Sequence, residues 1–315
     1  MPLFCSPWFI FEGHKCSDEF ISDNCPGFYF QFGLTQNEKT FSSLNPSNYK
    51  MNTKARIASI FQAETLSEKI TGFPAFSLKL LQCDENIDLE LPIHMRLGHM
   101  VERIVGELLK ASGNFKVLHE NVQIVENKRT IGEIDFILQE MPTQKIIHLE
   151  FAYKFYLFDP GISKNTINNW IGPNRNDSLI EKIQKLKERQ FPILYTPQAK
   201  ERLSEIHDDI QQELCLLASL YIPYNYNHDF DPEYKNAIKG YYLHFVDFRN
   251  LDHSQVRYYI PDKKEWGMDP SENRVWLCYE DIQEKIHLRT EEKQTPMVWL
   301  KREGHCEAFF VTWWR

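Results

Sequence analysis

The sequence predicts an α/β domain of the α+β type, with a mixed central sheet flanked by helices, and three observations predict it. An apolar stripe at helical spacing runs through residues 94–110. Three extended runs follow at 115–125, 130–139 and 145–158, separated by short polar turns. A capped helix and then an apolar run at 214–222 come next. The expected order is therefore helix, three strands, helix, strand.

Composition and charge limit the class of protein. The 315 residues are 42% hydrophobic and 14% aromatic, enough to bury a full core. No apolar run approaches the roughly 18 residues of a membrane span, and the opening segment lacks the features of a secretory signal. We therefore expect a cytoplasmic protein without a membrane partner. Seven scattered cysteines without a CxxC pair predict neither a disulfide framework nor a zinc site. The net charge of −8 argues against a protein that coats nucleic acid, although it is compatible with a local basic surface.

The chain divides into four segments. Residues 1–50 show no sustained period and are either irregular or an artefact of gene calling, in which case translation would start at Met51. A helical segment (51–93) precedes the core (94–223), and an aromatic α/β extension packed on that core is expected over 224–315. The strands expected in this extension are GYYLHF, RYYI, VWLCY and AFFVTWWR, around a helix near 280–290.

The first helix of the core carries an acidic side chain at the edge of its apolar stripe. This residue is Glu102, and Gly98 and Gly106 lie four residues to either side of it on the same face. Glycine is unfavourable inside a helix unless a neighbour approaches closely. We therefore expect the following hairpin to pack against this face.

Two carboxylates face each other across the predicted hairpin. If residues 141–144 form a four-residue loop, Asp135 lies directly opposite Glu150, with Cβ atoms roughly 5 Å apart. Like charges at that separation destabilise a sheet unless a positive group lies between them. A divalent cation would supply that charge. The alternative is a polar face that Lys154 and water neutralise without a metal ion.

Side-chain alternation assigns a core face and a polar face to these strands. In the third strand, the odd-numbered residues from Ile147 to Phe155 point toward the core. The even-numbered ones, which carry the polar chemistry, are His148, Glu150, Ala152 and Lys154. In the second strand, the apolar side holds Ile134, Phe136 and Leu138, and the polar side holds Glu133 and Asp135. His148 could be a further metal ligand, a phosphate donor or a hydrogen-bonded sheet residue, and we favour the last.

A basic stretch follows the hairpin. Between Lys164 and Arg202 there are eight Lys or Arg against four Asp or Glu. Within it, an S-x-x-E capping box starts a helix at Ser178. The cations Lys182, Lys185 and Arg189 fall on one stripe of that helix. The stripe either contacts a nucleic-acid backbone or is an ordinary solvated helix face.

These residues together resemble the PD-(D/E)XK nuclease superfamily. A glutamate on the first helix, an acidic residue in the second strand, a glutamate in the third and then a lysine follow one another, and the predicted αβββαβ order is similar to the restriction-endonuclease-like core of that superfamily. The stretches RLGHMVE, HLEFAYKFYL, GPNRND and AFFVTWW look like an uncharacterised bacterial family of unknown function grouped with it. The similarity runs from about residue 55 to the end.

The resemblance implies a metal-dependent phosphodiesterase acting on DNA or RNA. Asp135 and Glu150 would ligate Mg²⁺ or Mn²⁺, with the backbone carbonyl of Phe151 as a further ligand, and Glu102 would assist from the helix. The superfamily lysine would be Lys154. The nucleic-acid backbone would lie along the basic stripe defined above.

One departure from the superfamily pattern leaves a second function open. Lys154 lies four residues after Glu150, whereas the usual spacing is two, and Ala152 occupies that position. Two residues along a strand displace a side chain by about 6.6 Å on the same face. The alternative is therefore a nuclease-derived module that binds nucleic acid or protein without hydrolysis.

Overall fold

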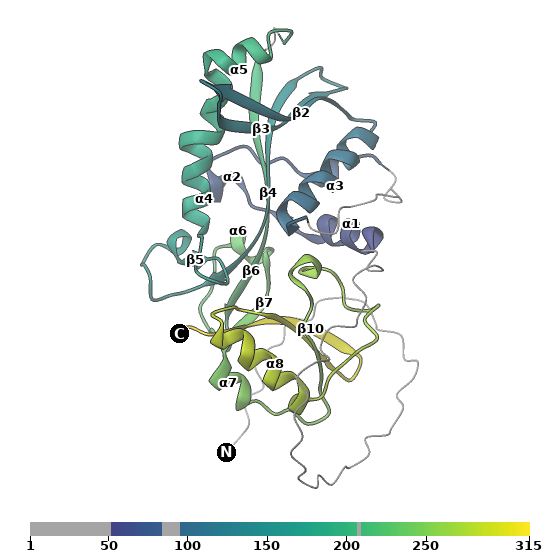
Figure 1. Ribbon diagram of the computed structural model, residues 1–315, viewed down its shortest axis with the longest axis vertical. Helices are drawn as coiled ribbons and strands as arrows, with labels where there is room; N and C mark the ends of the chain where they lie inside the picture. The colour runs from purple at the N-terminus through teal and green to yellow at the C-terminus, as the bar shows by residue number, and fades with distance from the viewer. Residues whose placement is uncertain (1–51, 84–94, 207–208) are drawn as a thin grey trace.

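The computed structural model describes residues 52–83, 95–206 and 209–315 (Figure 1). The predictions for residues 1–50, including a start at Met51, lie outside the described residues. The predicted segment 51–93 is described only to residue 83. It contains the helices α1 (Thr53–Gln62) and α2 (Glu68–Thr71), joined by the short strand β1 (Glu64–Thr65).

The core contains the long elements that the sequence predicts, with extra turns between them. The predicted helix is α3 (Leu97–Ala111), and the hairpin strands with the strand before them are β2 (Phe115–Glu126), β3 (Arg129–Glu140) and β4 (Ile146–Phe158). After the short strand β5 (Trp170–Ile171) come α4 (Leu179–Lys185), a π-helical turn (Leu186–Gln190), a 3-10 turn (Phe191–Tyr195), α5 (Pro197–Arg202) and β6 (Ile210–Pro223). As predicted, Ser178 caps α4, because its hydroxyl accepts a hydrogen bond from the Glu181 amide.

One mixed sheet runs through the whole described fold. Its order is β2-β3-β4-β6-β7-β10-β9-β8, with β1 beside β6 and β5 beside β4. The central pairs from β4 through β6 and β7 to β10 are parallel, whereas the pairs at both ends are antiparallel. Helices lie on both faces (Figure 1). The predicted α/β class with a mixed, helix-flanked sheet is therefore confirmed.

Residues after 223 extend this same sheet rather than form a separate one. Their strands are β7 (Ile238–His244), β8 (Arg257–Tyr259), β9 (Met297–Arg302) and β10 (His305–Thr312), and their helices are α6 (Pro232–Lys235), α7 (Phe245–Arg249) and α8 (Tyr279–Glu291). The predicted strand at VWLCY is wrong, since only Leu277 makes an isolated bridge, to Tyr258, and the helix begins at Tyr279. The sequence pattern did not identify β9.

The two faces of β4 are buried under different helices. Its odd-numbered residues, with Phe136 and Leu138 of β3, lie in the cluster that contains the apolar stripe of α3. On the other face, Ala152 and Tyr156 pack with Leu179 and Ile183 of α4. The alternation predicted for β4 is therefore confirmed. Ile134 was expected beside Phe136 but packs with Val122 and Ile193 in another cluster.

Gly106 lets α3 approach the hairpin closely. A Cβ at this position would lie 3.3 Å from the ring of Phe136. The expectation that the hairpin packs on this helix face is therefore confirmed at Gly106. A Cβ at Gly98 would meet no atom of the described residues within 4 Å, so packing does not explain that glycine.

Candidate active site

The β3–β4 hairpin has the predicted backbone register. Phe136 pairs with Leu149 and Ile137 with His148, the register in which the next pair would be Asp135 and Glu150. Residues 141–144 form the predicted four-residue loop, closed by a 2.8 Å hydrogen bond from the Gln144 amide to the Glu140 carbonyl. The predicted register is therefore confirmed for the four pairs that precede the carboxylates, whereas Asp135 and Glu150 themselves are not a backbone pair.

The strands separate at the carboxylates. The β3–β4 ladder ends at Phe136 and Leu149, beyond which β3 stays paired with β2, and β4 with β6. Asp135 lies at this fork. Its carboxylate Oδ2 accepts a 2.9 Å hydrogen bond from the Phe151 amide, in place of a strand partner. The fork therefore holds a buried carboxylate against the backbone of the neighbouring strand.

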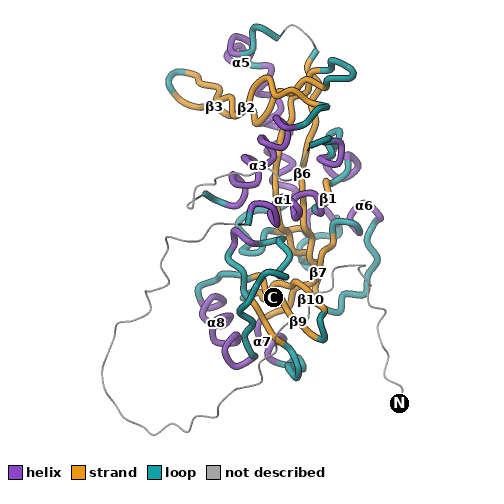
Figure 2. The backbone as a smooth tube through the Cα atoms, turned by 90° about the vertical axis from the view of Figure 1, so that its right-hand side faces the viewer, coloured by secondary structure: helices purple, strands orange, loops and turns teal. Residues whose placement is uncertain are grey.

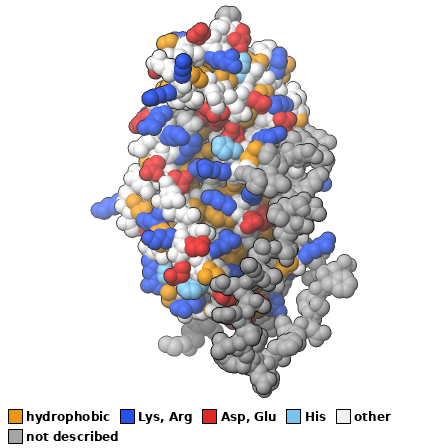
Figure 3. All heavy atoms as spheres, viewed as in Figure 1, with side chains coloured by type: hydrophobic (Ala, Val, Ile, Leu, Met, Phe, Trp, Pro, Cys, Tyr) orange, Lys and Arg blue, Asp and Glu red, His pale blue; other side chains and the backbone are white. Residues whose placement is uncertain are grey.

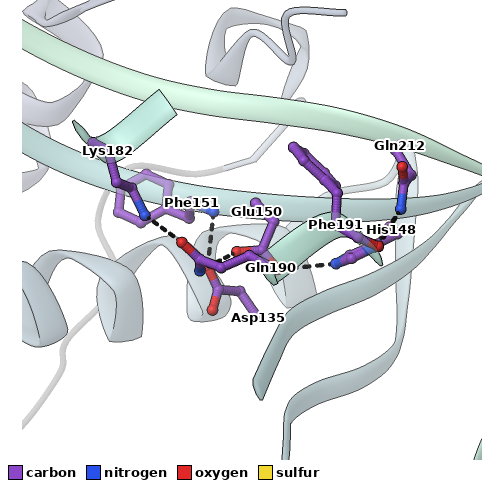
Figure 4. A network of polar contacts seen from close by, with 8 residues as sticks. All are labelled: Asp135, His148, Glu150, Phe151, Lys182, Gln190, Phe191 and Gln212. Atoms are coloured by element: carbon purple, nitrogen blue, oxygen red, sulfur yellow. Dashed lines mark hydrogen bonds and ion pairs between the residues drawn. The ribbon is translucent and has the colours of Figure 1, made fainter. Parts of the chain in front are cut away.

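Glu150 is fully buried and both of its oxygens accept hydrogen bonds (Figure 4). His148 Nε2 lies 2.9 Å from Oε1, and the amide nitrogen of Gln190 lies 2.6 Å from Oε2. The Gln212 amide nitrogen lies 3.4 Å from His148 Nδ1 and donates to the Phe191 carbonyl at 2.7 Å. A donor at Nδ1 leaves the imidazole proton on Nε2, so His148 donates to Glu150. His148 thus has partners at both nitrogens, which agrees with the favoured interpretation.

The π turn after α4 aligns Gln190 with Lys182. In an uninterrupted α-helix, a side chain eight residues on would point about 80° away from the first. A π turn contains one extra residue, so Gln190 takes the place of a seventh residue, within about 20° of Lys182. The Lys182 ammonium accordingly donates to the Gln190 amide oxygen at 2.9 Å (Figure 4). The turn therefore connects the lysine to Glu150 through one amide.

Burial disfavours the ionised form of both carboxyl groups, and for Asp135 the charge of Glu150 adds to this effect. Burial raises the pKa of Asp135, and the nearby Glu150 raises it further, whereas the Phe151 amide and Lys182 oppose the shift. Burial also raises the pKa of Glu150, against the effect of Lys182. The pKa of Lys182 is itself lowered by burial, although both carboxylates favour its charged form. The three groups form one electrostatic unit.

Glu102 and His148 are perturbed by the same surroundings. Burial raises the pKa of Glu102 to about 7, with a further contribution from Asp135, so the α3 glutamate lies within electrostatic reach of the fork as predicted. Its side chain is 22% exposed. Burial lowers the pKa of His148 to about 4, so the imidazole is neutral at physiological pH.

Lys154 occupies a different place from the one expected of the superfamily lysine. Its ammonium forms a 2.7 Å ion pair with Asp177, in the loop before α4, and the two side chains are 35% and 43% exposed. Lys182 was predicted to bind the nucleic-acid backbone. It is instead the lysine whose charge acts on both carboxylates. Sequence spacing could not show that Lys182, rather than Lys154, acts on the carboxylates, because this depends on how α4 packs over the sheet.

The predicted basic stripe is not continuous. Lys182 is mostly covered, whereas Lys185 and Arg189 are exposed. The extra residue of the π turn rotates Arg189 about 120° from Lys182, whereas an uninterrupted helix would align them. Gln190 was not among the predicted residues. The spacing between Lys182 and Gln190 is eight residues, which would not align the two side chains in an uninterrupted α-helix. Helical periodicity therefore gives no reason to connect them.

The described residues contain no group of three or more His, Cys, Asp and Glu side chains arranged to hold a metal ion. The Asp135–Glu150 pair is therefore at most a two-carboxylate site within that part of the chain. In the same residues, no helix is long and apolar enough to cross a membrane.

Comparison with known proteins places the chain in a family. Residues 58–308 match the family model described as a domain of unknown function, DUF1853. The match covers most of the chain, and this protein belongs to that family. No curated protein and no solved structure matches the sequence.

Proposed function

We propose that this protein is a metal-dependent phosphodiesterase, a nuclease-like hydrolase that acts on DNA or RNA at the fork between β3 and β4. The observation that carries the proposal is the burial of Asp135 and Glu150 side by side, with Lys182 as a nearby cation. Such a pair costs free energy in a sheet. Sites that retain such pairs are frequently functional. A relation to the PD-(D/E)XK nucleases forms part of this proposal.

The donor set fits Mg²⁺ or Mn²⁺. Both are hard cations that prefer oxygen ligands, and Mg²⁺ is commonly held by one or two carboxylates, with water and substrate phosphate completing its shell. A site without a third protein carboxylate is therefore compatible with it. Asp135 and Glu150 would hold the cation, which would supply Lewis-acid polarisation of a phosphate and a more acidic water.

The surrounding side chains can carry the remaining chemistry. Lys182 would stabilise negative charge that develops on the phosphate. Glu102, with a pKa of about 7, is suited to accept a proton from water near neutral pH. Gln190 and His148 each donate to Glu150 and so fix the direction of its carboxylate. Lys154 is engaged by Asp177 and has the weaker claim to the catalytic role.

A cleavage assay tests this function. Single- and double-stranded DNA and RNA should be cleaved in the presence of Mg²⁺ or Mn²⁺, and chelation should stop the reaction. Glu150→Gln and Asp135→Asn should each reduce cleavage by at least about a hundredfold, the scale expected for loss of a charge-stabilising group. Glu107→Gln, on the exposed side of α3 beside Lys110, is the matched control and should retain activity.

Calorimetry with the same cations, combined with the cleavage assay, separates the two candidate functions. Binding that depends on Asp135 and Glu150, together with cleavage, is the expected result. Metal binding without cleavage of any substrate would favour the non-hydrolytic module, to which Ala152 at the usual lysine position points. Absence of both would contradict the metal site itself.

A further inference from the structure

The β2–β3 hairpin ends in a turn of a defined type. Glu126 pairs with Arg129, so the loop consists of Asn127 and Lys128 alone. Their φ angles are 49° and 64°, both in the left-handed region. Two central residues with positive φ define the type I′ turn, whose twist suits a hairpin. Asn is favoured at the first position and Gly at the second, so Lys128 is the unusual residue.

The same chain builds this kind of turn with glycine elsewhere. Between β9 and β10, Arg302 pairs with His305, and the two loop residues are Glu303 and Gly304, with φ angles of 49° and 80°. A side chain in the left-handed region costs free energy that glycine avoids. The turn therefore does not require a lysine. Strain retained at one position is a reason to look for a function there.

The hairpin projects from the body of the molecule (Figure 2), and the residues at its end are exposed. Val125 and Ile131 are 49% and 45% exposed, and Lys128 and Arg129 are exposed between them. A register shift between Ile124 and Val125 marks a bulge, which increases local twist. The tip thus presents two cations and one carboxylate, Glu126, between two apolar side chains.

The hairpin is anchored close to its turn. A Cβ at Gly132 would lie 2.2 Å from Cδ1 of Ile193, so the strand lies directly on the 3-10 turn. Gln198, on α5, donates a 2.7 Å hydrogen bond to Glu126. An exposed tip held in this way is preorganised for contact, because little conformational freedom remains to be lost on binding.

The tip lies on the same strand as Asp135. Six residues separate Asp135 from Arg129, a span of about 20 Å along β3, which corresponds to about six base pairs of a duplex. Figure 3 shows Lys and Arg side chains gathered over α4 and α5, interspersed with acidic ones. The exposed cations on α4, the π turn and α5 are Lys185, Lys187, Arg189, Lys200 and Arg202. Positive charge therefore extends from the fork toward this end of the molecule.

We propose that the β2–β3 hairpin is an arm that contacts a nucleic-acid duplex on one side of the cleavage site. Lys128 and Arg129 would bind phosphates, and Val125 and Ile131 would lie against the groove wall. A two-stranded ribbon fits the major groove of B-DNA, which is about 12 Å wide. This inference rests on the proposed function and specifies its substrate as double-stranded.

Lys128→Gly gives effects of opposite sign on stability and binding. The variant should unfold at higher temperature, because glycine relieves the left-handed strain. Its affinity for a duplex of about 30 base pairs should fall about eightfold at 0.1 M salt, and the slope of log affinity against log salt should decrease by about 0.9, the value for one lost phosphate contact. Binding is measured in the Glu150→Gln background so that the duplex stays intact.

Lys293→Gly is the matched control. Lys293 is an exposed lysine with a φ of 55°, just beyond α8 at the other end of the sheet. Like Lys128→Gly, this substitution removes one positive charge from a residue with a left-handed φ angle. Duplex affinity should not change in this control. Equal losses of duplex affinity in Lys128→Gly and Lys293→Gly would contradict the proposed arm. A parent protein that cleaves duplexes, with no loss of duplex affinity in Lys128→Gly, would contradict it as well. An equal loss on a single strand would overturn the duplex assignment. A parent that neither binds nor cleaves nucleic acid would remove the proposed function as well.

Discussion

Replacing Lys182 by Met should destabilise the protein by about 3 kcal/mol at pH 8. Removing one partner of a buried charge pair leaves the other charges uncompensated, which typically costs 3–5 kcal/mol. Lys182 lies beside two buried carboxylates and opposes the rise in pKa of each. At pH 5 these carboxyl groups hold protons, so the lysine has less charge to balance and the loss should be smaller. Urea denaturation at the two pH values measures both effects.

Lys154→Met is the matched comparison. Its ion pair with Asp177 is partly exposed, and such pairs contribute roughly 0–1 kcal/mol. We expect little change in stability at either pH. If the cleavage activity exists, Lys182→Met should reduce it by at least about a hundredfold and Lys154→Met much less. The reverse pattern would return the catalytic role to Lys154.

In the absence of divalent cations, stability should fall as the pH rises from about 4.5 to 8. Glu102 shows why stability falls, rather than rises, with increasing pH. Burial raises its pKa from 4.5 to about 7, so the folded protein holds a proton that the unfolded chain releases. The stabilisation that this bound proton gives to the folded protein is complete below pH 4.5 and is lost as the pH rises through 7. The change corresponds to about 3 kcal/mol. Asp135 and Glu150 act in the same direction.

Thermal unfolding across this pH range, with and without Mn²⁺, measures the effect. Mn²⁺ should restore stability at pH 8, because it binds the folded site and favours ionised carboxylates. Asp135→Asn with Glu150→Gln should be more stable than the parent at pH 8 without metal and should not respond to Mn²⁺. A pH-independent parent would show that these carboxylates are less buried than described.

The elements of the core were predictable because each depends on local chemistry. The stripe of α3 and the alternation of β4 follow from side-chain periodicity, and the capping box at Ser178 follows from a single turn. VWLCY shows the limit of this approach. An apolar run has the same composition in a strand and in a segment leading into a helix, so its neighbours decide between them.

The carboxylate pair was predictable and its lysine was not. Hairpin register follows from loop length, which places Asp135 beside Glu150 once residues 141–144 form the loop. The roles of Lys182 and Gln190 depend on a π turn, and no propensity in the sequence identifies one extra residue in a helical turn. Packing of α4 over the sheet, a tertiary effect, decides which cation reaches the fork.

The position of β10 constrains how the sheet can assemble. This strand, at residues 305–312, lies between β7 and β9, so it is synthesised after the parallel neighbour that it covers. Until it is added, β7 has one unpaired edge, which can pair with another chain. A chain truncated before residue 305 should therefore aggregate during translation, even though it contains every residue proposed for catalysis. Pairing across such long sequence separations also predicts slow folding.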